Sequence, residues 1–168
     1  MPATPGVTAP EAGLGRRMGA VVYETLVVAA IVLVAGFALA PVVSPSAGPS
    51  GPLVLPTGPG RAAGLAGLVS VLGLYFGWFW TGGRCTLPMK TWHLALVDRR
   101  GEPLRAGRAL ARYAAAWLGP VASVALVAGT QSRAGWLALA FPYAWAFVDP
   151  ARCFLHDRVA GTRLVRRD

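Results

Sequence analysis

Residues 18–40 read MGAVVYETLVVAAIVLVAGFALA, and Glu24 is the only charged residue among them. An α-helix rises about 1.5 Å per residue, so about 20 apolar residues cross a hydrocarbon layer of roughly 30 Å. This stretch is long enough to cross, and Pro41 is expected to end the helix. The sequence therefore predicts a membrane-spanning helix close to the N-terminus.

Three later stretches are also apolar and free of charged residues, and they predict spans at about 62–80, 113–129 and 134–148. The last has only 15 uncharged residues and contains Pro142, so a re-entrant or interfacial helix is the alternative to a full crossing. We expect an all-α membrane protein, a bundle of about four transmembrane helices. Its membrane domain covers residues 14–166, and residues 1–13, rich in Pro, Ala, Thr and Gly, form a disordered tail.

The composition excludes a soluble domain. Of 168 residues, 55% are hydrophobic and 14% charged, whereas soluble proteins carry roughly 25% charged residues. The net charge of +9 would ordinarily suggest nucleic-acid binding. Here the arginines lie between apolar stretches, where membrane topology and anionic lipid place them. The expected partner is the lipid bilayer, and no nucleic acid is expected.

The basic residues also predict the orientation. With four spans and the N-terminus inside, fourteen basic residues lie in the cytoplasm and two, Arg61 and Arg133, lie outside. With three spans the ratio falls to nine against seven. Basic residues favour the cytoplasmic side of a membrane. We therefore expect four spans, both termini in the cytoplasm, a cytoplasmic loop at 81–112 and a cytoplasmic tail at 149–168.

Charged residues in or near the spans are the candidate ion or proton sites, because inserting each one costs free energy. Glu24 lies about one and a half turns into the first span, and Arg17, seven residues earlier, shares its helical face. His156 and Asp157 directly follow the fourth span. A carboxylate, an arginine and an imidazole at one membrane surface are suited to proton relay. The same residues are equally suited to an ion pair that fixes the helices.

Other residues predict contacts rather than chemistry. The spacing of Arg105, Arg108 and Arg112 puts them on one face of an amphipathic helix, where they are candidates for lipid-headgroup contact. Gly73 and Gly77 form a small-xxx-small pattern that predicts close helix packing. Residues 99–103 (RRGEP) predict a turn, and Gly161 predicts a second turn before an extended end at 162–165.

No pattern of catalytic residues is recognisable, so no enzyme activity and no catalytic residue are expected. Apart from Cys153 and His156, no two histidines or cysteines have metal-ligand spacing on one element, and neither a metal nor a cofactor is expected. Cys85 and Cys153 lie far apart in the sequence and are expected to remain free thiols.

Three segments resemble the RDD family of bacterial membrane proteins, named for an arginine and two aspartates. They are RRMGAVVYE at 16–24, GRCTLPMKTW at 83–92 with the VDRRGEPL stretch at 97–104, and HDRVAGT at 156–162. The resemblance places Arg17 at the family's arginine position and Asp157 at its second aspartate. Glu24 stands at the first aspartate position, a departure that keeps the charge and lengthens the side chain by one methylene.

The resemblance implies a multi-pass protein of the bacterial inner membrane with a role in transport, of a small solute or of cations in exchange for protons. The alternative is a non-catalytic membrane subunit that assists assembly or regulation of a partner complex. A homo-oligomer or a membrane partner protein is compatible with either function. The small size of the chain and the glycine-rich second span favour the subunit, whereas the carboxylates at the membrane favour transport.

Overall fold

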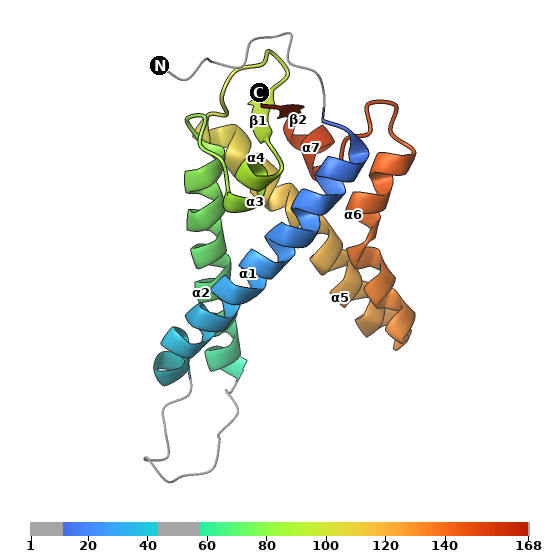
Figure 1. The fold of residues 1–168 in the computed structure, drawn as a ribbon. Helices are drawn as coiled ribbons and strands as arrows, with labels where there is room; N and C mark the ends of the chain where they lie inside the picture. Colours follow the sequence, from blue (N-terminus) through green and yellow to red (C-terminus); the bar gives the residue numbers. More distant parts are fainter. Residues whose placement is uncertain (1–11, 44–57, 168) are drawn as a thin grey trace. The chain divides into compact units, whose positions relative to one another are not determined.

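The computed structural model describes residues 12–43 and 58–167 and is mostly helical, at 72% (Figure 1). Three helical stretches are long and apolar enough to cross a membrane: Leu14–Val43, Gly58–Trp80 and Ala106–Thr130. These stretches support a membrane protein. The chain divides into two compact units, one made of residues 22–75 and the other of residues up to 21 together with 76 onward.

The unit of residues 22–75 contains most of the two longest helices, α1 (Leu14–Val43) and α2 (Gly58–Trp80). Glycines of α2 make their contact close, because a Cβ at Gly67 would lie 2.8 Å from Leu39 Cδ1 and a Cβ at Gly64 would lie 3.4 Å from Val43 Cγ1. The predicted packing position Gly77, in the other unit, has no heavy atom of the described residues within 4 Å of such a Cβ.

Both helices are longer than the sequence predicted. α1 continues through Pro41 to Val43, because a proline near a helix end removes one hydrogen bond while its fixed φ still suits a helix. α2 begins at Gly58 rather than at residue 62. Pro59 is its second residue, where the backbone N–H has no partner within the helix in any case. The predicted loop between the helices falls mostly on residues 44–57, outside the described residues.

The other unit contains the short helix α3 (Leu87–Thr91), the longer helices α4 (Ala106–Ala116) and α5 (Leu118–Thr130), and α7 (Leu155–Ala160). It also holds two strands, β1 (Leu94–Asp98) and β2 (Thr162–Arg166), which pair antiparallel with Leu96 opposite Leu164. The expectation of an all-α protein is therefore wrong in this detail. Five-residue strands leave little periodic signal in a sequence dominated by long apolar stretches.

The two predicted turns of this unit are confirmed. Gly101 has φ +85°, and the Asp98 carboxylate accepts hydrogen bonds from the backbone N–H groups of Arg100 (2.8 Å) and Glu102 (3.0 Å). Gly161 ends α7 with φ +65°, a conformation that glycine adopts without steric cost. The extended end after Gly161 is strand β2.

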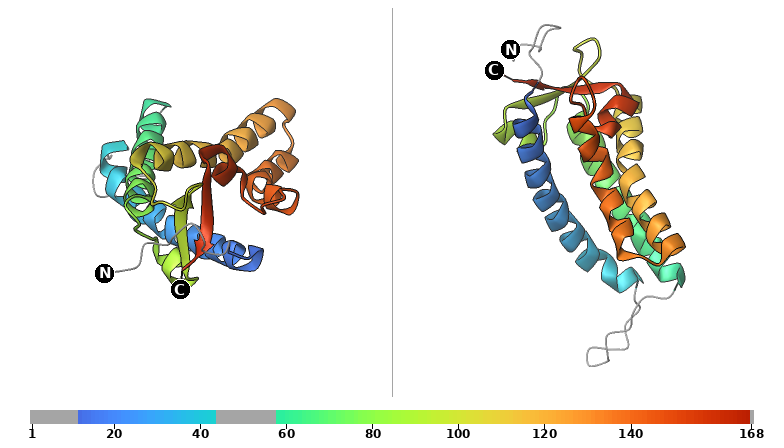
Figure 2. Two further views of the ribbon diagram at one scale, coloured as in Figure 1. Left: turned by 90° about the horizontal axis from the view of Figure 1, so that it is seen from above. Right: turned by 90° about the vertical axis from the view of Figure 1, so that its right-hand side faces the viewer.

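The segment predicted as a fourth span is not one continuous α-helix. It consists of a 3₁₀-helix, η1 (Arg133–Leu139), a single α-helical turn, α6 (Phe141–Ala144), and a second 3₁₀ turn, η2 (Trp145–Phe147). η1 runs antiparallel along α5 (Figure 2). Gly135 makes this contact close, since a Cβ there would lie 2.7 Å from the backbone nitrogen of Val127.

The core of this unit is apolar and joins both strands to the helices. Leu94, Leu96 and Leu164 from the sheet are buried with Trp80 and Phe154.

The chain just before α1 joins the same core. The predicted disordered tail at 1–13 lies outside the described residues up to residue 11, but Ala12 is buried, and its backbone N–H donates to the Leu164 carbonyl at 3.1 Å. Ala12, which the sequence placed in that tail, therefore belongs to the core of this unit.

Candidate functional site

A buried ion pair links α4 to α7. Arg112 Nε donates to Asp157 Oδ1 at 2.7 Å, and Arg112 Nη2 lies 3.2 Å from His156 Nε2. Thr162 Oγ1 donates to the same Asp157 oxygen at 3.1 Å. Since a guanidinium group only donates hydrogen bonds, His156 Nε2 accepts, and the neutral imidazole carries its proton on Nδ1. The exposed fraction is 4% for the Arg112 side chain and 0% for that of Asp157.

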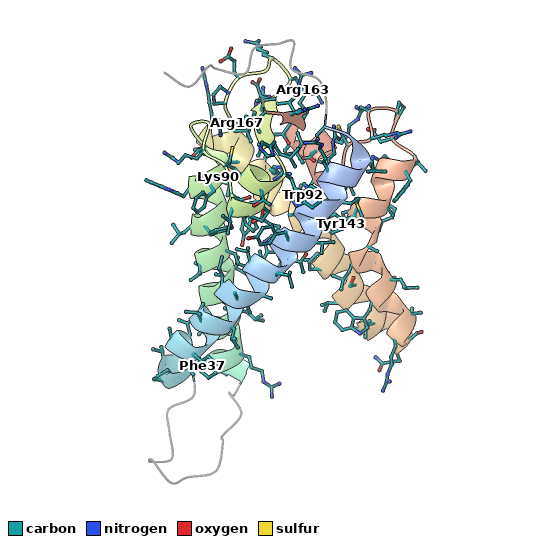
Figure 3. All side chains as sticks on the ribbon, in the orientation of Figure 1. Phe37, Lys90, Trp92, Tyr143, Arg163 and Arg167 are labelled. Atoms are coloured by element: carbon teal, nitrogen blue, oxygen red, sulfur yellow. The ribbon has the colours of Figure 1, made fainter. Side chains whose placement is uncertain are left out.

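Aromatic rings surround this ion pair. The Arg112 guanidinium carbon lies 4.2 Å from the ring centroid of Trp80, a cation–π contact. The His156 ring stacks on Phe154 with centroids 5.5 Å apart and meets Tyr143 edge-on at 5.9 Å. Tyr143 comes from α6 and is labelled in Figure 3. The rings exclude water from the pair and hold the imidazole in one orientation.

The surroundings fix the charge of both titratable groups. Burial by itself would raise the pKa of the Asp157 carboxyl, but the charge of Arg112 and the hydrogen bonds from Arg112 and Thr162 hold it below its usual range. Burial lowers the pKa of the His156 imidazole to about 4, with Arg112 lowering it further and Asp157 opposing the shift. At neutral pH the cluster therefore contains an ionised aspartate, an arginine and a neutral histidine.

Arg17 forms a second buried contact, between the start of α1 and the C-terminal segment. Its exposed fraction is 1%. Nη1 donates to the Arg152 carbonyl at 2.7 Å and lies 3.7 Å from Cys153 Sγ, while Nη2 donates to the Leu164 carbonyl at 3.3 Å. Arg152 has φ +49°, which costs a non-glycine residue about 1–2 kcal/mol. The contact thus joins α1 to the residues on both sides of α7.

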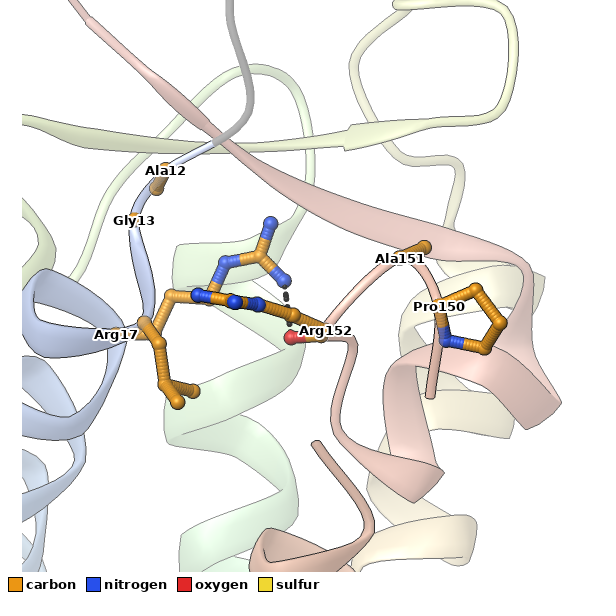
Figure 4. A pocket seen from close by; sticks show the side chains of 7 residues that line it. Ala12, Gly13, Arg17, Pro150, Ala151 and Arg152 are labelled. Carbon is orange, nitrogen blue, oxygen red and sulfur yellow. Dashed lines mark hydrogen bonds between the residues drawn. The ribbon is translucent and has the colours of Figure 1, made fainter. Parts of the chain in front are cut away.

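A cavity of about 230 Å³ lies beside this contact (Figure 4). Residues 12–14 at the start of α1 form one side, and residues 150–152 form another. The side chains of Arg17 and Arg152 both line it. Within the described residues, its lining contains two cationic side chains and no carboxylate.

Glu24 lies in the unit of residues 22–75, inside the first apolar helix. Its Oε1 accepts a hydrogen bond from the Tyr75 hydroxyl on α2 at 3.0 Å, and the contact is partly buried. The carboxylate therefore accepts a hydrogen bond from a neutral hydroxyl group on the neighbouring helix. Tyr75 was not predicted as a site residue, because an aromatic residue in an apolar span is more often a packing residue.

The predicted site residues therefore separate into distinct environments. His156 and Asp157 lie beside Arg112, which was predicted to contact lipid headgroups. That prediction needs correction for Arg112, because the side chain turns inward to neutralise Asp157. Arg105 is exposed, and Arg108, with 44% of its side chain exposed, lies 3.5 Å from Asp98 and donates to the Gly161 carbonyl at 3.3 Å.

The residues that complete the buried cluster gave weaker signals in the sequence. Thr162 falls in the HDRVAGT segment, but nothing in its spacing predicted a hydrogen bond to Asp157. Trp80 and Tyr143 lie in apolar stretches where aromatic residues are common. The basic spacing at 105, 108 and 112 predicted the helical face correctly, and only the tertiary contact distinguishes the buried arginine from the exposed ones.

Three helical stretches long and apolar enough to cross a bilayer are typical of a helical membrane protein. The sequence model of the RDD family matches residues 11–161. The chain therefore belongs to the RDD family. Comparisons with curated proteins and with solved structures gave no match.

Proposed function

We propose that this protein exchanges a monovalent cation for a proton, or carries a small solute with a proton, and that Glu24 is the ion-binding carboxylate. The observation that carries the proposal is the position of Glu24, six residues after Met18 in an apolar helix, with the Tyr75 hydroxyl 3.0 Å from its oxygen. At about 1.5 Å per residue, this is roughly 9 Å into the predicted span. Ionisable residues at such depth mark ion and proton pathways.

The environment of the other predicted site residues favours a structural role for them. Asp157 already has a buried arginine as its counter-charge, and His156 is held neutral by its surroundings. Arg17 donates to backbone carbonyls of two segments. A residue that exchanges protons or cations needs access to them, and these three are buried in contacts that fix the fold. This reasoning assigns ion exchange to Glu24 and helix fixation to Arg17, His156 and Asp157.

We further propose that the chain crosses a bacterial inner membrane four times with both termini in the cytoplasm. The distribution of basic residues, fourteen against two, supports this orientation. The 3₁₀ content of residues 133–147 supports the fourth crossing. A 3₁₀-helix rises about 2.0 Å per residue, so these 15 residues extend to about 28 Å rather than about 22 Å.

The test is proton and monovalent-cation flux in liposomes that contain only the purified protein. Wild type is expected to carry flux, and Glu24→Gln, which keeps the shape and removes the charge, is expected to lose it. Glu24→Asp restores the family's residue type and should retain flux. Glu102→Gln is the matched control, because it makes the same change at an exposed residue of the loop before α4. Absence of flux in folded wild type, or equal flux in Glu24→Gln, would contradict the proposal.

The alternative function is a non-catalytic membrane subunit that assists a partner complex, as a homo-oligomer or with another membrane protein. One observation favours it: Arg112, His156 and Asp157 contact one another and are closed to solvent. An ion pair that is closed to solvent stabilises the fold of a unit that a partner protein could bind, and it is not accessible to a transported ion. This function predicts no flux from the pure protein and stable co-extraction of a partner from native membranes.

A further inference from the structure

We propose that the end of α2 and the start of α3 bind the headgroup phosphate of an anionic phospholipid from the surrounding bilayer. The surface that binds it, called the interfacial surface below, consists of four exposed side chains: Trp78, Arg84, Leu87 and Lys90. Three of them come from the GRCTLPMKTW segment at 83–92, to which ion exchange at Glu24 gives no role. The proposal does not depend on that exchange.

The interfacial surface lies where an apolar helix ends. α2 is long and apolar enough to cross a membrane, and its last residue is Trp80. Trp78, two residues before that end, is 62% exposed. Tryptophan residues near the ends of spanning helices lie at the level of the lipid headgroups. We therefore expect the exposed indole of Trp78 to contact the boundary between acyl chains and headgroups.

The chain turns back after α2 and places a cation on this indole. Gly82 has φ +61° and Gly83 has φ +74°, values that glycine adopts without steric cost. The Arg84 guanidinium carbon then lies 4.1 Å from the ring centroid of Trp78. Arg84 Nε donates to the Trp78 carbonyl at 2.8 Å, and Nη2 donates to Thr81 Oγ1 at 3.1 Å. The guanidinium is thus fixed at the carbonyl end of α2, against the exposed ring.

This geometry suits Arg84 to phosphate binding. A guanidinium group has five N–H donors, and the two hydrogen bonds described above use two of them. Because the residue is exposed, a ligand can reach the group from outside. The planar arrangement of arginine donors matches the oxygens of a phosphate. The side chain is already held by its contacts, so binding costs little further side-chain entropy.

Helix α3 adds a second cation and an apolar side chain. Its Pro88 and Met89 are buried and attach it to the rest of the unit. Leu87 is 54% exposed, and Lys90, labelled in Figure 3, is exposed as well. Residues three apart share one side of a helix. A leucine beside a lysine on one side suits the boundary between acyl chains and phosphates.

The charge of this part of the chain favours an anionic lipid over a neutral one. Residues 76–97 contain Arg84 and Lys90 and neither aspartate nor glutamate. Anionic headgroups attract basic residues next to a spanning helix, whereas phosphatidylcholine has no net charge. The apolar contacts of Trp78 and Leu87 can form with either lipid, so we assign the selectivity to the two cations.

The experiment measures which lipid lies beside Trp78. Full-length protein is reconstituted in phosphatidylcholine bilayers with increasing fractions of phosphatidylglycerol or phosphatidylcholine that is brominated near the headgroup end of an acyl chain. Bromine quenches tryptophan fluorescence at short range, and the difference between wild type and Trp78→Phe gives the signal of Trp78. One cation near an anionic surface contributes about fivefold to association. We therefore expect half-maximal quenching at an at least fivefold lower fraction of phosphatidylglycerol than of phosphatidylcholine.

Variants identify the groups that select the lipid, and each is measured with and without Trp78→Phe. Lys90→Gln and Arg84→Gln should each lower the selectivity for phosphatidylglycerol by up to about fivefold. Arg84→Lys keeps the charge but loses the planar donors, and it should retain part of the selectivity. Arg100→Gln is the matched control, because it removes one exposed charge from the β1–α4 loop and should leave the selectivity unchanged.

The thermal stability of each variant is measured first. Arg84→Gln removes hydrogen bonds at the end of α2 and is expected to lower the unfolding temperature. Lys90 is exposed on α3, so Lys90→Gln should unfold close to the wild-type temperature and tests the surface by itself.

Three results would overturn the proposal. The first is equal quenching of Trp78 by both brominated lipids. The second is no quenching by either lipid, which would mean that protein or water, rather than lipid, covers the indole. The third is wild-type selectivity in folded Lys90→Gln, or a loss in Arg100→Gln as large as that in Lys90→Gln.

Discussion

Replacing Asp157 by asparagine should destabilise the protein far more than removing an exposed ion pair. Asp157 accepts hydrogen bonds from Arg112 and Thr162 and has no exposed side-chain surface. Asp157→Asn keeps the shape but leaves the positive charge of Arg112, a side chain with 4% exposure, without a counter-charge. Breaking a buried ion pair from one side costs about 3–5 kcal/mol. We expect the free energy of unfolding to fall by that amount.

The matched control is Arg158→Gln. Arg158 Nε lies 3.5 Å from Asp149 Oδ1, but 57% of the Arg158 side chain is exposed. Asp149 is buried, with 3% of its side chain exposed, but its Oδ2 keeps the hydrogen bond from the Cys153 backbone N–H at 3.0 Å. Because the Arg158 guanidinium lies largely in water, its loss should cost about 1 kcal/mol. The assay is reversible unfolding in mixed micelles, followed by tryptophan fluorescence, on wild type and both single variants at pH 7.

A double-mutant cycle then isolates the ion pair. Arg112→Gln with Asp157→Asn removes both charges, so the double variant should be more stable than the sum of the two single losses predicts. If Asp157→Asn costs no more than Arg158→Gln, or if the two losses simply add, the ion pair does not hold α4 to α7 and the reasoning fails.

The remaining predictions concern pH and packing. The pKa of His156 is lowered to about 4 in the fold from about 6.5 in the unfolded chain, so the unfolded state binds the proton more tightly. Neutral His156 therefore makes its full contribution to the free energy of unfolding above about pH 6.5. This contribution is lost as the pH falls toward 4, and the free energy of unfolding drops by about 2 kcal/mol between pH 7 and pH 5. His156→Gln should flatten this dependence in unfolding curves at the two pH values, and an unchanged slope would contradict the assignment. Gly135→Ala should cost about 1–3 kcal/mol, because the new Cβ would meet the Val127 backbone nitrogen at 2.7 Å. Gly129→Ala on α5, with no described heavy atom within 4 Å, should be neutral or stabilising in the same measurement, and equal effects would argue against close packing of η1 on α5.

The sequence was most informative about the long helices. A run of apolar residues without charges has one stable solution in a bilayer, in which the helix satisfies its own backbone hydrogen bonds. This is why residues 18–40 and 62–80 were predicted as spans and fall within α1 and α2. The turns at Gly101 and Gly161 were predictable for a related reason, since a glycine beside polar residues is a local signal.

Contacts between segments that lie far apart in the sequence could not be predicted from the pattern of residues. Arg105, Arg108 and Arg112 have the same side-chain chemistry and helical spacing, and only the approach of α7 makes Arg112 the counter-charge of Asp157. Strands β1 and β2 are separated by 63 residues and are defined by pairing with each other. The break of residues 133–147 into 3₁₀ and α turns depends on packing against α5, which hydropathy does not describe.

The central claim is that Glu24 binds the transported ion while the Arg112–Asp157 pair fixes the fold. The most direct measurement is proton release when Na⁺ or K⁺ is added to purified protein in weak buffer, with wild type beside Glu24→Gln and Glu102→Gln. We predict release from wild type and from Glu102→Gln, and none from folded Glu24→Gln. Equal release from Glu24→Gln, or none from wild type with either cation, would contradict cation–proton exchange at Glu24.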